Sequence, residues 1–269
     1  MSVLRLSASS YSNTAPLVWS FLYGQNHGKV ELILDTAPAR SAELLAQGRV
    51  DAALVPVIAC QLIENVRLVP DVCVGAKERV RSVALITKGE DLPQVRSVAL
   101  DISSKTSVTL TKIIFREFLG FEPAWTHAEP DLDKMLETAD CALLIGDPAL
   151  KLSVPPAVAG GSSLKVFDLA ELWRGFTGLG FVFAMWMTRA EKLGLDLASA
   201  RDEGLAHIDE IVANYEKEIK LPPGDFKTYL TENISYSVSD SMLGGMELYF
   251  RLAAKNGLIA ENKPLSFIY

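Results

Sequence analysis

The stretch VLRLSASSYSNTAPLVWSFLYG, residues 3–24, joins an apolar strand to an apolar helix through a polar turn. We expect the strand over residues 3–8 and the helix over residues 15–23. Asn13 or Thr14 caps this helix, and a proline is tolerated in the first helical turn. Further hydrogen-bonding side chains crowd the same turn, namely Ser9, Ser10, Tyr11 and Ser12. A cap does not need them, so we interpret the turn as part of a ligand site.

The same alternation of apolar strands and helices continues along the first third of the chain. Strands are expected over residues 30–34 and 51–57. The helix between them starts at Ser41 and stops at Gly48, since glycine suits the left-handed conformation after a helix. Apolar strands separated by helices are typical of a parallel sheet that is covered on both faces. Such sheets bind ligands at the carboxyl ends of their strands, which is where the polar turn lies.

A second series of strands and helices, similar in size to the first, follows. Strands are expected over residues 79–89, 97–101, 123–126, 141–147 and 181–187, and helices over residues 102–120, 131–137, 200–219 and 239–257. Two such series joined by two long strands indicate a two-lobed α/β protein with a ligand cleft between the lobes. We place residues 1–88 and 183–269 in lobe one and residues 89–182 in lobe two.

The composition restricts the possible partners. The 269 residues are 49% hydrophobic and carry a net charge of −7, which argues against nucleic acid or an anionic membrane as the main partner. The N-terminus lacks the pattern of a signal peptide, and no apolar run reaches the roughly 20 residues that cross a bilayer. Cys60, Cys73 and Cys141 show no paired spacing, so we expect reduced thiols in a cytoplasmic protein, with no disulfide framework and no metal site.

The segment DISSKTSVTL, residues 101–110, leads from a strand into a helix. It carries four hydroxyl side chains, Ser103, Ser104, Thr106 and Ser107. The first amides of a helix lack intrahelical partners, and the helix dipole places partial positive charge at the same end. A carboxylate or phosphate can bind there without a lysine. The alternative is a serine cap that has serine neighbours. Because the turn at residues 9–13 has the same design, the two turns predict a ligand with two anionic groups.

Other segments supply further candidates. In LLIGDPAL, Gly146 permits a close backbone approach to a ligand, and Asp147 is an acid, a base or only a helix cap. Thr177 and Gly178 lie in WRGFTGLG, near the return to lobe one, and either shape a pocket or serve core packing. Ser82 is an isolated hydroxyl in an apolar strand, which alone is more typical of a core serine. Since no HExxH, CxxC, GxSxG or P-loop pattern occurs, we expect neither a metal site nor a nucleophilic triad.

Together these segments resemble the signatures of the chorismate dehydratases of the futalosine route to menaquinone, the MqnA family. SYSNTAPL, residues 10–17, is similar to the family's SYLNTxPL, with Ser12 in place of leucine. GRVDAALVP, residues 48–56, is similar to its G-x-x-D-x-x-L-V-P. DISSKTSVTL, LLIGDPAL and DLAELWRGFTGLGFVFAMW resemble three more signatures, with Gly180 where proline is usual. The resemblance spans nearly the whole chain in the same order.

The resemblance implies a fold like the type-two periplasmic binding proteins, in which two lobes close on a ligand. It implies that chorismate, a small molecule with two carboxylates, loses water to give 3-[(1-carboxyvinyl)oxy]benzoate. We expect no cofactor. Carried over from matching motifs, Asn13 and Ser82 are the expected catalytic residues, and Ser103, Ser104, Thr106 and Ser107 are expected to hold a carboxylate. The other expected substrate-binding residues are Ser10, Tyr11, Gly146, Asp147, Thr177 and Gly178.

Two other functions are alternatives. The naphthoate-forming enzyme of the same pathway shares the two-lobed fold. Its opening signature is richer in Pro and Cys and includes Asp-Thr-Phe, which SYSNT fits poorly. An intracellular sensor or binding protein for a small anion would hold a similar ligand without converting it.

Overall fold

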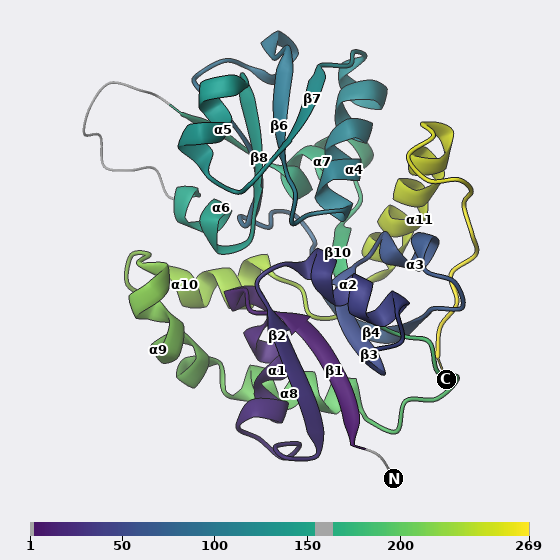
Figure 1. Ribbon diagram of the computed structural model, residues 1–269. Helices are drawn as coiled ribbons and strands as arrows, with labels where there is room; N and C mark the ends of the chain where they lie inside the picture. Colours follow the sequence, from purple (N-terminus) through teal and green to yellow (C-terminus); the bar gives the residue numbers. More distant parts are fainter. Residues whose placement is uncertain (1–2, 154–163, 269) are drawn as a thin grey trace.

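The computed structural model describes residues 3–153 and 164–268, which form two lobes, each built on a five-stranded sheet (Figure 1). The first sheet has the order β2-β1-β3-β10-β4 and the second the order β7-β6-β8-β5-β9. The first contains β1 (Leu4–Ser9), β2 (Val30–Asp35), β3 (Ala52–Pro56), β4 (Arg67–Ala76) and β10 (Phe181–Thr188). The second contains β5 (Val83–Thr87), β6 (Ser97–Asp101), β7 (Ala124–Ala128), β8 (Cys141–Ile145) and β9 (Lys165–Asp168). The two-lobed α/β architecture that the sequence predicts is confirmed.

The two sheets follow one plan. In each, three strands run parallel, β2-β1-β3 in the first sheet and β7-β6-β8 in the second. The next strand, β10 or β5, is antiparallel to its neighbours. The sheets are therefore mixed, whereas the sequence pattern predicted parallel ones. These two strands are antiparallel because the chain reaches each of them by crossing from the other lobe. It therefore enters β5 and β10 at the side of the sheet where the parallel strands have their carboxyl ends.

The crossing points differ from the expected lobe boundary. We expected residues up to Lys88 in lobe one, but β5 pairs with β8 and β9 in the second sheet. The chain therefore leaves the first sheet after Ala76, and residues 77–82 cross to the second. It returns through residues 178–180 into β10. An apolar run of five residues has the same sequence pattern in either sheet, so the pattern alone could not assign β5.

Helices cover both sheets. The first lobe carries α1 (Ala15–Leu22), α2 (Pro38–Ala46), α3 (Ala59–Leu62), α8 (Leu197–Ala206), α9 (Ile208–Ile219), α10 (Asp225–Thr228) and α11 (Asp240–Lys255). The second carries α4 (Thr106–Ile113), which continues as a π-helical turn (Ile114–Leu119), together with α5 (Leu132–Thr138), α6 (Gly146–Leu152) and α7 (Leu169–Thr177). Gly48 and Gly120 follow α2 and the π-helical turn with φ of +66° and +78°, as the sequence predicts. In the part of the chain that the structure describes, no helix is long and apolar enough to cross a membrane.

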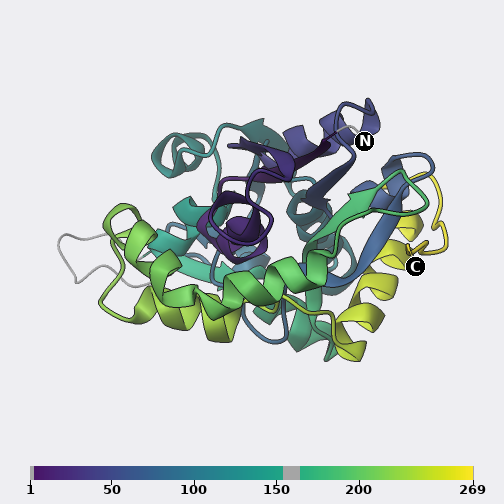
Figure 2. The same cartoon turned by 90° about the horizontal axis from the view of Figure 1, so that it is seen from below.

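One helix predicted from the sequence is two separate helices in the structure. Residues 200–219 were expected to form a single helix, but α8 and α9 meet at His207, whose φ of −108° and ψ of 26° interrupt the helical backbone. The His207 ring stacks on Trp19 of α1, with centroids 3.8 Å apart. At Gly204 of α8, a Cβ atom would lie 1.9 Å from the carbonyl oxygen of Pro16, so only glycine allows this approach to α1. Figure 2 shows α8 and α9 crossing the molecule on this side.

A continuous apolar core links the lobes. It runs from Leu6 and Trp186 in the first sheet to Leu100 and Leu143 in the second, all fully buried. Cys60, Cys73 and Cys141 are free thiols, as expected from their spacing. A shared core holds the lobes around the crossing segments and fixes where their inner faces meet.

Candidate functional site

A cavity lies between the two lobes. Its polar lining consists of Ser9, Tyr11, Asn13, Thr14, Ser104, Thr106, Ser107 and Gly146, and its apolar lining of Pro38, Leu54, Pro56, Val74, Val83, Ile145, Phe183 and Ala184. The polar residues follow the carboxyl ends of β1, β6 and β8, the usual position of ligands on such sheets. Both polar turns identified in the sequence therefore face one cavity.

The first turn follows β1 and forms the 3₁₀ helix η1 (Ser12–Thr14) before α1. The Thr14 Oγ1 atom lies 2.6 Å from the Ser9 carbonyl oxygen and 2.7 Å from that of Tyr11, so this hydroxyl closes the turn. Asn13 lines the cavity, and its exposed fraction is only 8%. Ser10 is exposed and lies outside the lining, and its amide donates to the Asp35 carbonyl at 2.8 Å. Of this turn, Tyr11 and Asn13 are the expected site residues that reach the cavity.

The second turn precedes α4 and contains two hydroxyls whose protons are available to a ligand. The Ser104 Oγ atom accepts from the Ser107 amide at 3.2 Å, and Thr106 Oγ1 accepts from the Ile58 amide at 3.3 Å. Each oxygen is an acceptor in these bonds, so each O–H can donate into the cavity. Ser107 lines the cavity beside them, in the first turn of α4. Unpaired helix amides and the dipole favour an anion at this position.

Ser103 differs from its neighbours. Its hydroxyl donates to Asp101 Oδ1 at 2.5 Å and its amide donates to the same oxygen at 2.8 Å. Ser103 does not line the cavity. Burial raises the pKa of Asp101, and these two bonds from Ser103 oppose the rise. The expectation that Ser103 holds a carboxylate of the ligand is therefore corrected, because its proton is already donated to a buried aspartate.

Gly146 allows the lobes to approach at the edge of the cavity. Its φ is +66°, and a Cβ atom there would lie 2.7 Å from the ring of Tyr11 on the other lobe. Its amide donates to the Ser82 carbonyl at 2.7 Å. Burial raises the pKa of Tyr11, while a hydrogen bond with the Ser103 side chain opposes the rise. We expected Gly146 to let a ligand approach its backbone closely. In the structure the Tyr11 ring, which itself lines the cavity, makes this close approach.

Ser82 and Asp147 lie behind the cavity rather than on its surface. Ser82 is fully buried, and its hydroxyl donates a long hydrogen bond of 3.4 Å to the Val80 carbonyl oxygen. Asp147 accepts from the Ser12 hydroxyl at 2.5 Å and from the Ser12 amide at 3.2 Å. Burial raises the pKa of Asp147, and the Ser12 bonds lower it. Asp147 therefore joins the two lobes beside Asn13.

The sequence relationships agree with this geometry. Residues 4–255 match the family described as menaquinone biosynthesis. The chain belongs to this family. It is also 32% identical over 260 residues to the chorismate dehydratase of Thermus thermophilus, an alignment that covers 91% of this chain and 93% of that one.

Solved structures with the same fold are more distant in sequence. A protein of Archaeoglobus fulgidus superimposes with a TM-score of 0.67 at 14% identity, covering 95% of this chain and 98% of that chain. The periplasmic aliphatic sulphonate binding protein of Escherichia coli superimposes with a TM-score of 0.63 at 15% identity, covering 99% and 94%. This member of the menaquinone biosynthesis family thus has a periplasmic-binding-protein-like fold, as the sequence resemblance implied.

Two of the expected site residues end a helix instead of lining the cavity. The Thr177 hydroxyl donates to the Trp173 carbonyl at 2.7 Å, and Gly178 follows α7 with φ of +73°. Neither residue lies in the cavity lining. A threonine and a glycine at the end of a helix satisfy its last carbonyls, and this accounts for both residues. Their position at the returning segment is as expected, but their contacts are those of a helix end.

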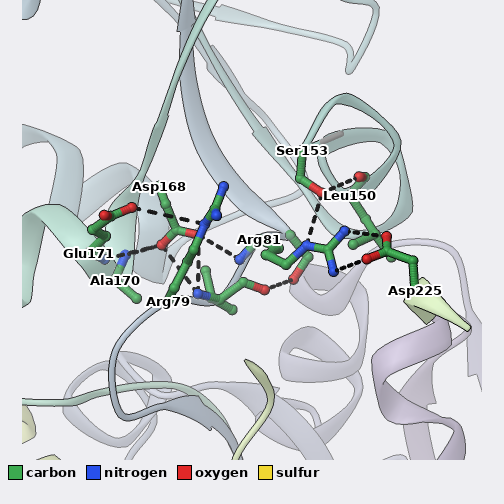
Figure 3. A network of polar contacts seen from close by, with 10 residues as sticks. Arg79, Arg81, Leu150, Ser153, Asp168, Ala170, Glu171 and Asp225 are labelled. Carbon is green, nitrogen blue, oxygen red and sulfur yellow. Dashed lines mark hydrogen bonds and ion pairs between the residues drawn. The ribbon is translucent and has the colours of Figure 1, made fainter. Parts of the chain in front are cut away.

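A polar network at the first crossing segment, residues 77–82, was not expected from the sequence. The Asp168 carboxylate caps α7 through the amides of Ala170 and Glu171 and also accepts from the amides of Val80 and Arg81 (Figure 3). The Arg81 guanidinium donates to both carboxylate oxygens of Asp225, at 3.0 and 2.6 Å, and to Ser153 Oγ at 3.1 Å. The sequence signal was the two arginines that flank Val80, immediately before Ser82. This network fixes the crossing segment behind the cavity.

Proposed function

We propose that this chain is a chorismate dehydratase, which eliminates water from chorismate to give 3-[(1-carboxyvinyl)oxy]benzoate. The observation that carries the proposal is the cavity between the lobes, which has hydrogen-bond donors at two helix starts. Asn13 precedes α1 in one lobe, and Ser104, Thr106 and Ser107 begin α4 in the other. Chorismate has two carboxylates, and each helix start can receive one. The relationship to the Thermus thermophilus enzyme supports the same assignment.

The substrate would be held mainly by neutral donors. The hydroxyls of Ser104 and Thr106, with the first amides of α4, would bind one carboxylate. The helix dipole contributes only about 0.3–1 kcal/mol, so the direct hydrogen bonds supply most of the affinity. Leu54, Val83 and Phe183 line the apolar wall against which the ring would pack. An apolar wall also strengthens the polar contacts, because it lowers the local dielectric constant.

The reaction needs a proton acceptor and stabilisation of developing charge. The proton leaves the ring carbon that carries the enolpyruvyl ether, hydroxide leaves the neighbouring carbon, and the two combine as water. Because the product ring is aromatic, the enzyme has only to lower the barrier. The cavity presents amide and hydroxyl groups, and the enolpyruvyl carboxylate of the substrate itself is the acceptor that fits this lining. Oriented internal transfers reach very high effective molarities.

Asn13 and the hydroxyls of α4 would then stabilise charge in the transition state. As the proton departs, negative charge gathers on the ring carboxylate, which the fixed donors of α4 would hold. Asn13, in the opposite helix start, would orient the enolpyruvyl carboxylate or assist the departing hydroxide. Removal of one preorganised donor of this kind raises a barrier by about 2.7–4 kcal/mol. Ser82 does not line the cavity, so it would affect the reaction indirectly, by positioning the residues that do.

The deciding experiment incubates the purified protein with chorismate and follows the benzoate-type absorbance of the product by liquid chromatography. We expect turnover by the wild type and strongly reduced turnover by Asn13→Ala and Ser82→Ala. The matched control is Asn214→Ala, on the exposed face of α9, which should keep wild-type turnover. If both cavity-region variants retain wild-type turnover, the residue assignment is wrong. If chorismate raises the melting temperature but no product forms, the protein is a binding protein instead.

A further inference from the structure

Tyr249 of α11, a helix of the first lobe, reaches across to the start of α4 in the second. Its side chain is fully buried, and its hydroxyl lies 3.1 Å from the main-chain carbonyl oxygen of Thr106. A carbonyl oxygen carries no proton, so the tyrosine hydroxyl is the donor. Tyr249 does not line the cavity, but Thr106 does. The first lobe is therefore bonded to the backbone of the turn that is expected to hold a substrate carboxylate.

The carbonyl of Thr106 belongs to the same peptide unit as the amide of Ser107. This amide donates to Ser104 Oγ at 3.2 Å. A hydrogen bond to a peptide oxygen increases the double-bond character of the C–N bond, and the N–H group of that peptide becomes a stronger donor. The bond that Tyr249 makes therefore strengthens the bond that the Ser104 oxygen accepts.

The bond from the Ser107 amide decides what the Ser104 hydroxyl can do. An amide N–H only donates, so Ser104 Oγ accepts here and its own proton stays free to be donated. Ser104 lines the cavity, where the anionic substrate would lie. A chain of donors thus runs from Tyr249 through one peptide to the Ser104 hydroxyl. A hydroxyl held as a donor in this way needs no reorganisation when negative charge develops on the substrate.

The position of the Tyr249 hydroxyl is fixed by the docking of α11. Ser241, Gly245 and Tyr249 follow at four-residue spacing, so they lie on one face of this helix. The Gly180 amide donates to Ser241 Oγ at 3.0 Å, and a Cβ atom at Gly245 would lie 2.0 Å from the Gly180 carbonyl oxygen. The Tyr249 ring packs edge-on against Phe181, with centroids 5.2 Å apart. This face therefore holds α11 against β10 and the residues before it, beside which it lies in Figure 1.

We propose that Tyr249 is a positioning residue of the anion site: its hydroxyl orients and polarises the first peptide of α4, which holds the Ser104 hydroxyl as a donor to the ring carboxylate of the substrate. This proposal rests on the proposed dehydratase function. A second bond from the first lobe acts beside it, because the Ile58 amide donates to Thr106 Oγ1 at 3.3 Å. The first lobe therefore sets the direction of both hydroxyls that the second lobe presents to the anion.

Tyr236 provides a matched control. It follows the π-helical turn η4 (Tyr229–Asn233), is also buried, and has a hydroxyl without a hydrogen-bond partner in the described part of the chain. Tyr236→Phe therefore removes a buried hydroxyl that makes no bond to α4. Tyr249→Phe keeps the ring and removes the bond to Thr106, whose carbonyl retains its helical partner four residues further along α4. Both variants should fold, which melting temperatures check.

The first test is a double-mutant cycle on kcat/KM for chorismate. We expect Tyr249→Phe to lower kcat/KM about 10-fold and Ser104→Ala to lower it about 10- to 100-fold. The double variant should match Ser104→Ala, because Tyr249 acts through Ser104. Tyr236→Phe should keep the wild-type value. Wild-type kcat/KM in Tyr249→Phe, or losses that multiply in the double variant, would overturn the positioning role while the dehydratase function stands.

The second test needs no turnover. Calorimetry measures the dissociation constants of the benzoate product and of 2-phenoxyacrylate, which is the same enol ether without the ring carboxylate. We expect Tyr249→Phe to weaken binding of the benzoate about 5- to 10-fold and to leave that of 2-phenoxyacrylate within about twofold. Equal weakening of both ligands, as a general structural change would cause, would overturn the positioning role. A wild-type protein that forms no product overturns the dehydratase function, and one that also fails to bind the benzoate overturns both.

Discussion

The hydroxyl of Ser12 donates a hydrogen bond of 2.5 Å to the carboxylate of Asp147, and the two residues belong to different lobes. The Ser12 amide donates to the same carboxylate at 3.2 Å. Asn13, the next residue, lines the cavity. The bond therefore ties the first lobe to α6 of the second immediately beside the proposed reacting centre.

Ser12→Ala should lower the free energy of unfolding. A hydrogen bond to a charged group contributes about 1.5–3 kcal/mol, and we expect a loss within this range because Asp147 is partly buried. Urea unfolding measures the change. The matched control is Ser199→Ala, which removes a 2.7 Å bond from a hydroxyl to the Asp196 carboxylate on an exposed helix start. That loss should stay below about 1 kcal/mol, since solvent screens exposed charges. Equal losses in the two variants would show that the interlobe bond adds nothing.

The local design of the site was predictable from the sequence, because it depends on short-range chemistry. Each turn combines a strand end, small polar residues and a helix start, and these features lie within a few residues of one another. Asn13 and Thr106 reach the cavity for this reason. The two-lobed architecture followed similarly from the repeated alternation of strands and helices.

The sequence did not predict which hydrogen-bond partners and neighbouring strands the residues would have in the fold. Ser103 and Ser104 are adjacent hydroxyls, but only Ser103 lies where it can donate to Asp101. The strand β4 was also missed, since Pro70 and Asp71 interrupt its apolar run and Asp71 has φ of +56°. Opposite this strand, the pairing of β10 shifts register. Such irregularities are stabilised by neighbours that are distant in sequence, so a periodic pattern does not reveal them.

Gly146→Ala should reduce activity more than its effect on stability predicts. The left-handed backbone costs about 1–2 kcal/mol for any residue with a Cβ atom. At Gly146 the new atom would also displace the Tyr11 ring, which lines the cavity. We expect kcat/KM for chorismate to fall by about 100-fold, as small misplacements of a site can do. Gly120→Ala is the control, because φ is +78° there and nothing lies within 4 Å of the added Cβ. It should lose similar stability but keep kcat/KM. A normal kcat/KM in Gly146→Ala would contradict the proposed role of Tyr11.

Asp101→Asn should change how stability depends on pH. Burial raises the pKa of Asp101 in the folded protein, so the folded state holds this proton to higher pH than the unfolded state does. The contribution of Asp101 to stability therefore falls as pH rises through the raised pKa. Asparagine lacks this titration. The free energy of unfolding of Asp101→Asn, relative to that of the wild type, should therefore increase as pH rises above the ordinary aspartate pKa of about 3.9.

Asp140→Asn is the control of opposite sign. The amides of Arg96 and Ser97 donate to Asp140 at 2.8 and 3.0 Å, and the Arg96 amide is the main reason that the Asp140 pKa is lowered. Its stabilising contribution is present above the unfolded pKa and is lost as pH falls through the folded pKa. The variant should therefore be less stable than the wild type at neutral pH and approach it in acid. Urea unfolding from about pH 2 to about pH 8 measures both, because the lowered pKa of Asp140 lies below the ordinary aspartate value of about 3.9. If the free energy of unfolding depends on pH in the same way in Asp101→Asn and in the wild type, burial does not raise the pKa of Asp101.

Arg81→Lys should destabilise the crossing segment although the charge is kept. The guanidinium donates to both oxygens of Asp225 and to Ser153, and its side chain is 8% exposed, whereas a lysine ammonium cannot reproduce this planar fork. Lysine at this φ of +62° bears the same backbone strain as arginine, so the substitution isolates the fork. We expect a loss of about 1–3 kcal/mol in urea unfolding. The control is Arg40→Lys, which changes an exposed ion pair with Glu43. Its free energy of unfolding should fall by less than about 1 kcal/mol. Equal stability of Arg81→Lys and wild type would show that charge alone holds the segment, because the lysine retains the charge and lacks only the geometry.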